Sequence, residues 1–170
     1  MSTVQFGYLL ASILAGVAVA GLLRTQTTVA RSRTLLAISL AVLIVALMCV
    51  GVVSRTIVRH IVQAIPAVIA LTLVARASPL APSASAPICT FWLGVMINIW
   101  LFILGIARIF SGTFSTVEIV LTIVIAAASA AGILAIVRST VRLATSTRLI
   151  TAVVFGIGQF VAMVASFQFG

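Results

Sequence analysis

Residues 34–53 read TLLAISLAVLIVALMCVGVV, twenty residues in a row without a charged side chain. A helix of about 20 predominantly apolar residues is long enough to cross the hydrocarbon core of a bilayer. Soluble domains carry charge on about a quarter of their residues, whereas 6% of this 170-residue chain is charged and 64% is hydrophobic. The mean hydropathy of the chain is +1.42. The sequence therefore predicts an integral membrane protein.

Five further stretches of similar composition flank this one. The six predicted spans are 6–23, 34–53, 57–75, 88–107, 116–137 and 149–167. They are apolar all round, without the alternation of polar and apolar residues that marks the strands of a membrane barrel. Because only helices and closed barrels satisfy their backbone groups inside a bilayer, we expect an all-α fold, a compact bundle of about six transmembrane helices that forms one domain over residues 1–170.

The third span, 57–75, is the least regular of the six. Pro66 lacks a backbone N–H and so leaves the carbonyl of Val62 without its helical donor. The uninterrupted apolar part, 64–75, is shorter than a bilayer is thick. We therefore expect either a helix kinked at Pro66 or a re-entrant segment that does not cross. Residues 76–87 then hold three of the four prolines, and we expect them to form the linker between the two halves.

The positive charge of the chain predicts its orientation. The formal charge is +9, from ten Arg, no Lys and one acid. Cytoplasmic loops of membrane proteins carry an excess of basic residues. The first, third and fifth loops hold seven of the ten arginines, and so we expect these loops inside and both termini outside. The seven are Arg24, Arg31, Arg33, Arg76, Arg138, Arg142 and Arg148; the other three are Arg55, Arg59 and Arg108.

The same arginines indicate which partners to expect. They lie singly or in threes between apolar spans, which is typical of topology signals and not of a nucleic-acid-binding face, so we expect no nucleic-acid partner. Anionic lipid headgroups are the partner that the charge favours. A basic set made of Arg alone is typical of a GC-rich bacterial genome, which favours the cytoplasmic membrane of a bacterium.

Polar side chains inside a membrane are costly and are therefore candidates for function. Arg59 and Gln63 share a helix face, with His60 beside them and Pro66 one turn later. A polar face that leads to a broken turn is how transporters build solute sites. The alternative is structural, with Arg59 and His60 as headgroup anchors and Gln63 bonded to a neighbouring helix. Asn98, inside the fourth span, is expected to bond across to another helix or to contact a solute.

Glu118 is the only acid of the chain. Ser115 and Glu118 match the S-x-x-E capping box at the start of a helix, and Arg108 is a natural counter-ion, so a structural role for these three residues is expected. A lone carboxylate excludes two-carboxylate chemistry. Cys49 and Cys89 lack the spacing of a metal site. We expect neither a metal nor a cofactor, and no enzymatic activity.

Small and aromatic residues predict how the helices pack. Small residues recur at every fourth position in three spans, which favours close helix contacts within the bundle or in an oligomer. Trp92, near the start of its predicted span, is expected to be an interfacial anchor, and Trp100 to pack more deeply. The small residues are Ser12, Gly16 and Ala20 in the first span, Ala128 and Gly132 in the fifth, and Gly158, Ala162 and Ser166 in the sixth.

Two functions fit these residues. The first is a non-enzymatic multi-pass membrane protein that acts as an accessory or assembly subunit, as a homo-oligomer or in a larger membrane complex. The second is a small-solute transporter or channel with a polar site around the third and fourth spans. The two differ in one structural feature, because a transporter requires the polar side chains to meet around a cavity large enough for water.

Overall fold

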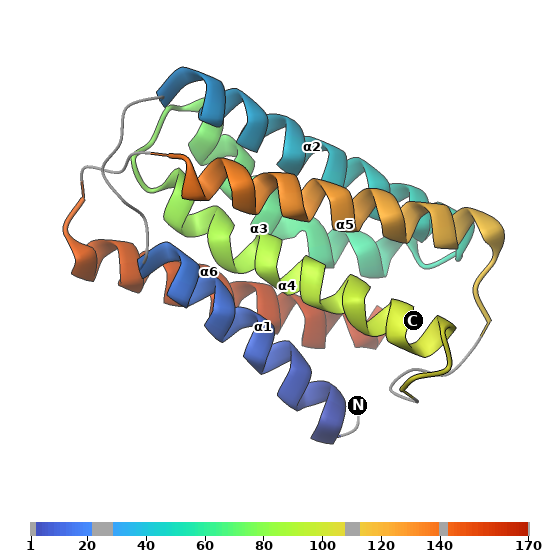
Figure 1. The fold of residues 1–170 in the computed structure, drawn as a ribbon. Coiled ribbons are helices and arrows are strands. Elements are labelled where there is room, and N and C mark those ends of the chain that lie inside the picture. Colours follow the sequence, from blue (N-terminus) through green and yellow to red (C-terminus); the bar gives the residue numbers. More distant parts are fainter. Residues whose placement is uncertain (1–2, 22–28, 108–112, 140–142, 170) are drawn as a thin grey trace.

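A computed structural model of the chain describes residues 3–21, 29–107, 113–139 and 143–169, and within these ranges all regular structure is helical (Figure 1). The helices are α1 (Thr3–Gly21), α2 (Val29–Val53), α3 (Ile57–Ala75), α4 (Ala81–Ile103), α5 (Thr116–Val137), α6 (Thr145–Ser166) and the short 3-10 helix η1 (Phe167–Phe169).

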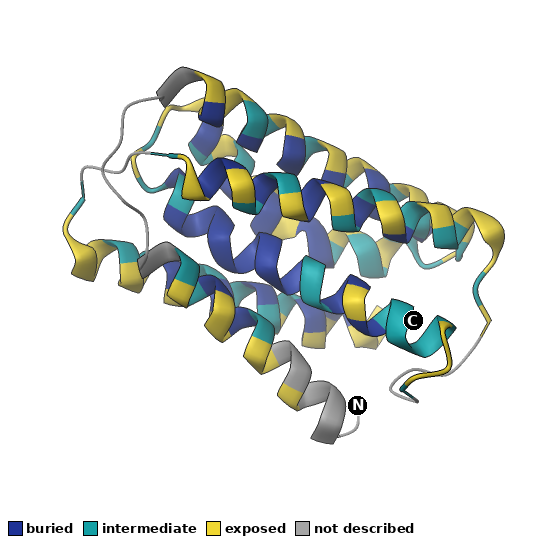
Figure 2. Ribbon diagram, in the orientation of Figure 1, coloured by how far each residue is buried: buried dark blue, intermediate teal, exposed yellow. Residues whose placement is uncertain are grey.

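The helices run up and down in a bundle, so that the connections alternate between its two ends (Figure 1). The C-terminal ends of α1, α3 and α5 and the N-terminal ends of α2, α4 and α6 lie at one end of the bundle. It is here named the basic end because it holds the described residues Arg31, Arg33, Arg76, Arg138 and Arg148. The connections α2–α3 and α4–α5 lie at the other end. Helix α4 contacts α1, α3, α5 and α6, and Figure 2 shows that most of it is buried.

Each outer helix buries one stripe and exposes the rest. On α2, Leu36, Leu40, Leu43 and Leu47 recur at helical spacing and are at most 2% exposed. The opposite face presents large apolar side chains such as Val45, which is 61% exposed. An apolar outer surface of this kind is suited to lipid rather than to water.

Five described helices are long and apolar enough to cross a membrane. They are Arg31–Val53, Ile57–Ala75, Ala81–Ile103, Thr116–Val137 and Thr145–Phe169, and α1 contributes a shorter apolar stretch, Leu10–Val19. The chain is thus an all-helical bundle whose composition suggests an integral membrane protein with several spans.

The predicted linker 76–87 is wrong beyond residue 80, because α4 already begins at Ala81. Pro82 stands in the first turn, where a missing N–H breaks no helical hydrogen bond. The hydroxyl of Ser85 donates to the Ala81 carbonyl (2.8 Å), which is how serine is accommodated inside a helix. The chain reverses within residues 76–80, where Ala77 has a φ of 54°.

The early start of α4 also changes the depth of its aromatic residues. Trp92 is the central residue of Ala81–Ile103 and is 3% exposed, so the prediction of an interfacial anchor is wrong. Its ring packs edge to face on Phe91, with 5.6 Å between the centroids. Trp100, expected to be deeper, is half-buried and lies nearer the end of the helix.

Two of the three small-residue stripes pack as predicted in their described parts. A Cβ on Gly16 would overlap the backbone of Pro87 and the Thr90 side chain, which shows how closely α1 approaches α4. Ala128 and Gly132 are buried as well. The α6 stripe is mixed, because Ser166 is buried and bonded to Gln63 of α3, whereas a Cβ on Gly158 would have nothing within 4 Å. An oligomer contact at Gly158 stays a prediction.

Candidate functional site

The tight turn between α2 and α3 carries the predicted polar cluster to the end of the bundle opposite the basic end. Arg55 adopts a left-handed conformation with φ 56°, and the Thr56 N–H donates to the Gly51 carbonyl (2.8 Å). A Cβ on Gly51 would lie 3.0 Å from the Cβ of His60. Glycine at this position therefore allows the start of α3 to pack directly on the end of α2.

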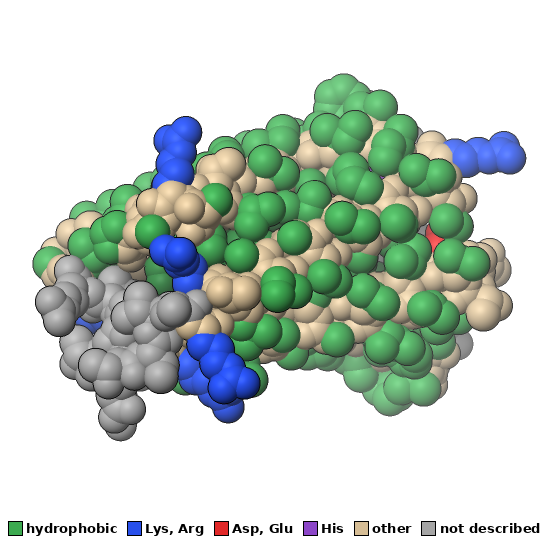
Figure 3. Space-filling model, turned by 90° about the horizontal axis from the view of Figure 1, so that it is seen from above, with side chains coloured by type: hydrophobic (Ala, Val, Ile, Leu, Met, Phe, Trp, Pro, Cys, Tyr) green, Lys and Arg blue, Asp and Glu red, His purple; other side chains and the backbone are tan. Residues whose placement is uncertain are grey.

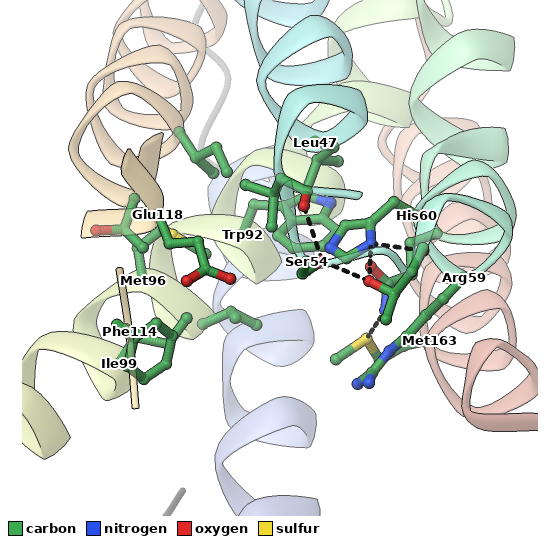
Figure 4. A pocket seen from close by; sticks show the side chains of 16 residues that line it. Leu47, Ser54, Arg59, His60, Trp92, Met96, Ile99, Phe114, Glu118 and Met163 are labelled. Carbon is green, nitrogen blue, oxygen red and sulfur yellow. Dashed lines mark hydrogen bonds between the residues drawn. The ribbon is translucent and has the colours of Figure 1, made fainter. Parts of the chain in front are cut away.

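A pocket of about 280 Å³ lies beside this turn, between α2, α3, α4, α5 and α6 (Figure 4). A water molecule in the liquid occupies about 30 Å³, so the pocket has room for several waters or one small organic solute. Its apolar lining is Leu47, Val50, Trp92, Val95, Met96, Ile99, Phe114, Ile125 and Met163, and its polar lining is Ser54, Thr56, Arg59, His60, Gln63, Glu118 and Thr122.

Arg59 and Glu118 approach this pocket from opposite sides, one on α3 and the other at the start of α5 (Figure 4). The guanidinium carbon of Arg59 lies 4.4 Å from the centroid of the Phe167 ring. This cation–π contact fixes the position of the charge without using the N–H donors of the guanidinium. Arg59 is thus held at the pocket with donors left for an anionic group.

His60 is held by the residue that precedes α3. Its Nδ1 lies 3.1 Å from the Thr56 carbonyl oxygen and 3.2 Å from the Thr56 hydroxyl oxygen. A carbonyl only accepts, so the tautomer that bonds it carries its proton on Nδ1, and Nε2 of that neutral ring is an acceptor. The imidazole therefore has one nitrogen tied to the backbone and one that remains for a ligand.

Gln63 joins α3 to α6. Its Nε2 donates to Ser166 Oγ (2.9 Å) and to Met163 Sδ (3.2 Å). In return, Gln159 Nε2 donates to the Gln63 carbonyl (3.3 Å), which follows the Val62 carbonyl that Pro66 leaves without a helical donor. The structural alternative predicted that Gln63 bonds a neighbouring helix, and these bonds are of that kind. Gln63 lines the pocket, but its side-chain amide is used to hold α3 against α6.

Asn98 does not line the pocket. Its Nδ2 donates to the Gly94 carbonyl of its own helix (2.7 Å), and its buried Oδ1 has no hydrogen-bond partner in the described part of the chain. The predicted bond from this amide to another helix is therefore wrong. An asparagine side chain can donate to the carbonyl four residues earlier in its own helix. This bond competes with a bond to another helix, and the sequence pattern does not distinguish the two.

The predicted capping box is present at the start of α5. Glu118 Oε2 accepts from the Ser115 N–H (2.8 Å) and hydroxyl (2.7 Å), and Ser115 Oγ accepts from the Glu118 N–H (3.3 Å). A cap of this kind contributes about 0.5–2 kcal/mol. Both bonds that the Glu118 carboxylate accepts from Ser115 use Oε2, so Oε1 remains as an acceptor for a ligand in the pocket. Arg108 lies outside the described residues, and its ion pair with Glu118 stays a prediction.

Three aromatic residues belong to the site although the sequence analysis did not place them there. Trp92 and Phe114 line the pocket, and the ring of Phe167 makes the cation–π contact with Arg59. Trp92 was assigned the wrong depth, and Phe167 reads as the last apolar residue of a span. No periodicity links a residue of α3 with one that lies 108 positions later, so this contact had no signal in the sequence.

Among the described residues, no group of three or more His, Cys, Asp or Glu side chains could hold a metal ion. Comparison with protein-family models, with curated proteins and with solved structures finds no match to this chain. The function proposed below therefore rests on the pocket and its polar side chains.

Proposed function

We propose that the protein is a non-enzymatic multi-pass membrane protein that binds and carries a small solute through the pocket of Arg59, His60 and Glu118. The observation that supports this function is the convergence of these side chains, which come from α3 and α5, on one largely apolar chamber. A cation and an anion on opposite walls suit a small solute that carries both an anionic and a cationic group. This is the arrangement that a transporter requires.

The proposal includes a topology of six spans with both termini outside the cytoplasmic membrane of a bacterium. The described residues Arg31, Arg33, Arg76, Arg138 and Arg148 lie at the basic end, which the positive-inside rule assigns to the cytoplasm. The unbroken helix from Ile57 to Ala75 favours a crossing third span with Pro66 inside it, rather than a re-entrant one. The pocket then opens towards the outer face.

A second candidate is the accessory or assembly subunit, alone as a homo-oligomer or in a larger membrane complex. The bonds of Gln63 and Gln159 between α3 and α6 favour it, because they account for two intramembrane polar side chains without any solute. This function predicts a stable partner that copurifies with the protein, and no solute flux.

Uptake by proteoliposomes tests the proposed function. We expect uptake of one member of a panel of labelled amino acids, betaines and carboxylates, and at least about a tenfold loss in Arg59→Gln and in Glu118→Gln, because each removes a charge that pairs with the solute. Arg55→Gln, which removes an exposed charge on the same turn, is the control. Ser115→Ala should lower stability and keep uptake.

Glutamine can still complete a capping box but cannot ionise, so Glu118→Gln separates the two roles of this side chain. Equal uptake by Arg59→Gln, Glu118→Gln and Arg55→Gln would contradict the proposed site. If no member of the panel entered the proteoliposomes faster than it entered empty liposomes, the accessory subunit would be favoured.

A further inference from the structure

Helices α2 and α5 lie side by side, and the seam between them has two hollows on its outer surface. The hollow at the basic end has a volume of about 500 Å³ and is lined by Arg31, Ser32, Leu35, Ala135 and Arg138. The second lies farther along the seam, has a volume of about 300 Å³ and is lined by Ala41, Val42, Val45, Ala46, Cys49, Leu121 and Val124. One hollow is thus basic and the other apolar.

The two hollows occupy the same face of each helix. On α2, Arg31, Leu35, Val42 and Cys49 follow one another at intervals of four, seven and seven residues. An α-helix has about 3.6 residues per turn, so these intervals keep the four residues on one stripe. On α5, Leu121, Val124, Ala135 and Arg138 stand at intervals of three, eleven and three residues, which gives a second stripe facing the first.

Small side chains lie between the two hollows on α5. Ala128 and Ala131 stand seven and ten residues after Leu121, on the same stripe, and neither projects beyond its Cβ. Leu35 and Ala41 are six residues apart, which is about 9 Å along the α2 axis at 1.5 Å per residue. On α2, Ile38 lies between the two hollows on the same stripe and is 56% exposed. An acyl chain that leaves the basic hollow therefore passes beside the Ile38 side chain before it reaches the apolar hollow.

The charge of the basic hollow has no counterpart in this chain. Arg31 and Arg138 are both exposed, and the only acid, Glu118, precedes Arg138 by twenty residues on α5, or about 30 Å. Figure 3 shows several arginines near one end of this face, apolar side chains along its middle, and one arginine together with the acid at the far end. No acidic side chain of this sequence is therefore placed to neutralise the pair, which leaves it available to an external anion.

We infer that the α2–α5 seam binds one anionic phospholipid, with its phosphate between Arg31 and Arg138 and an acyl chain in the apolar hollow. Guanidinium groups bind phosphate through paired N–H donors, and the second hollow is lined by small and apolar side chains of both candidate spans, which suits an acyl chain. A free phosphate ion would fill the first hollow alone, so the apolar hollow favours a lipid. The inference is independent of the solute pocket at the opposite end of the bundle.

Thermal unfolding in neutral detergent, titrated with phosphatidylglycerol or phosphatidylcholine, tests this site. We expect phosphatidylglycerol to raise the Tm and phosphatidylcholine to leave it nearly unchanged. An arginine near an anionic lipid contributes about fivefold in affinity, so Arg31→Gln with Arg138→Gln should weaken the phosphatidylglycerol response about thirtyfold. The matched control is Arg33→Gln with Arg76→Gln, which removes the same charge at the same end from residues outside the hollow.

The apolar half of the site has its own test. Val42→Trp should fill the second hollow and reduce the response to phosphatidylglycerol, whereas Val154→Trp, at an exposed position of α6, should not. Equal losses in the two arginine double variants would overturn the proposal in favour of general surface attraction. A response to glycerol phosphate equal to that for the lipid, or an unchanged response in Val42→Trp, would overturn it as well.

Discussion

Gly16→Ala is expected to destabilise the bundle by about 3 kcal/mol, because overpacking of a close contact typically costs 1–3 kcal/mol and this contact is with backbone. The added methyl group would overlap Pro87 of α4, including its backbone nitrogen at 2.9 Å. A backbone atom cannot rotate away as the end of a side chain can, so α1 has to move off α4. The free energy of unfolding, measured in mixed micelles titrated with a denaturing detergent, checks this.

Gly7→Ala is the matched control on the same helix. Nothing lies within 4 Å of a Cβ at Gly7, and alanine is favoured over glycine inside a helix by up to about 1 kcal/mol. Gly7→Ala should therefore be neutral or slightly stabilising. Similar losses of stability in both variants would mean that α1 does not pack on α4 at Gly16.

Phe91→Ala is expected to cost about 2–4 kcal/mol. Phe91 is fully buried in α4 and packs edge to face on Trp92. In a bilayer, moving an apolar side chain from lipid into the protein core changes its free energy little, because lipid tails are as apolar as the core. The cost therefore comes mainly from the cavity left behind and from the lost aromatic contact.

Phe169→Ala provides the comparison for Phe91→Ala, because Phe169 is 53% exposed and its removal leaves no cavity. The same denaturing titration should show a change of less than about 0.5 kcal/mol for this variant. Two equally stable variants would contradict the packing of α4 at the centre of the bundle.

Helix class and approximate length could be read from the sequence because apolar runs of about 20 residues have few alternatives in a membrane. The fifth helix was predicted at its observed bounds, 116–137, because Ser115 and Glu118 mark its start. The start of the fourth was misplaced by seven residues. Pro82 and Pro87 resemble linker residues, yet one fits the first turn and the other packs against α1.

The candidate site was predictable only in part. Spacing placed Arg59, His60 and Gln63 together because they share one helix turn. It could not place Glu118 across from them, since that depends on how α5 packs against α2 and α4. Asn98 illustrates the opposite error, because its polar character drew attention while its amide bonds locally. Local patterns identify costly residues, and packing decides which of them share a cavity.

Sided labelling of a cysteine at position 122 tests the central claim, a solute pocket open to the outer face. Thr122 is 4% exposed overall but lines the pocket, whereas Ser129 lies seven residues farther along α5, is fully buried and does not line it. In a background without Cys49 and Cys89, a small membrane-impermeant thiol reagent added to intact cells should label Thr122→Cys and leave Ser129→Cys unmodified. Labelling of Thr122→Cys only after the cells are opened, or equal labelling of both variants, would contradict the account.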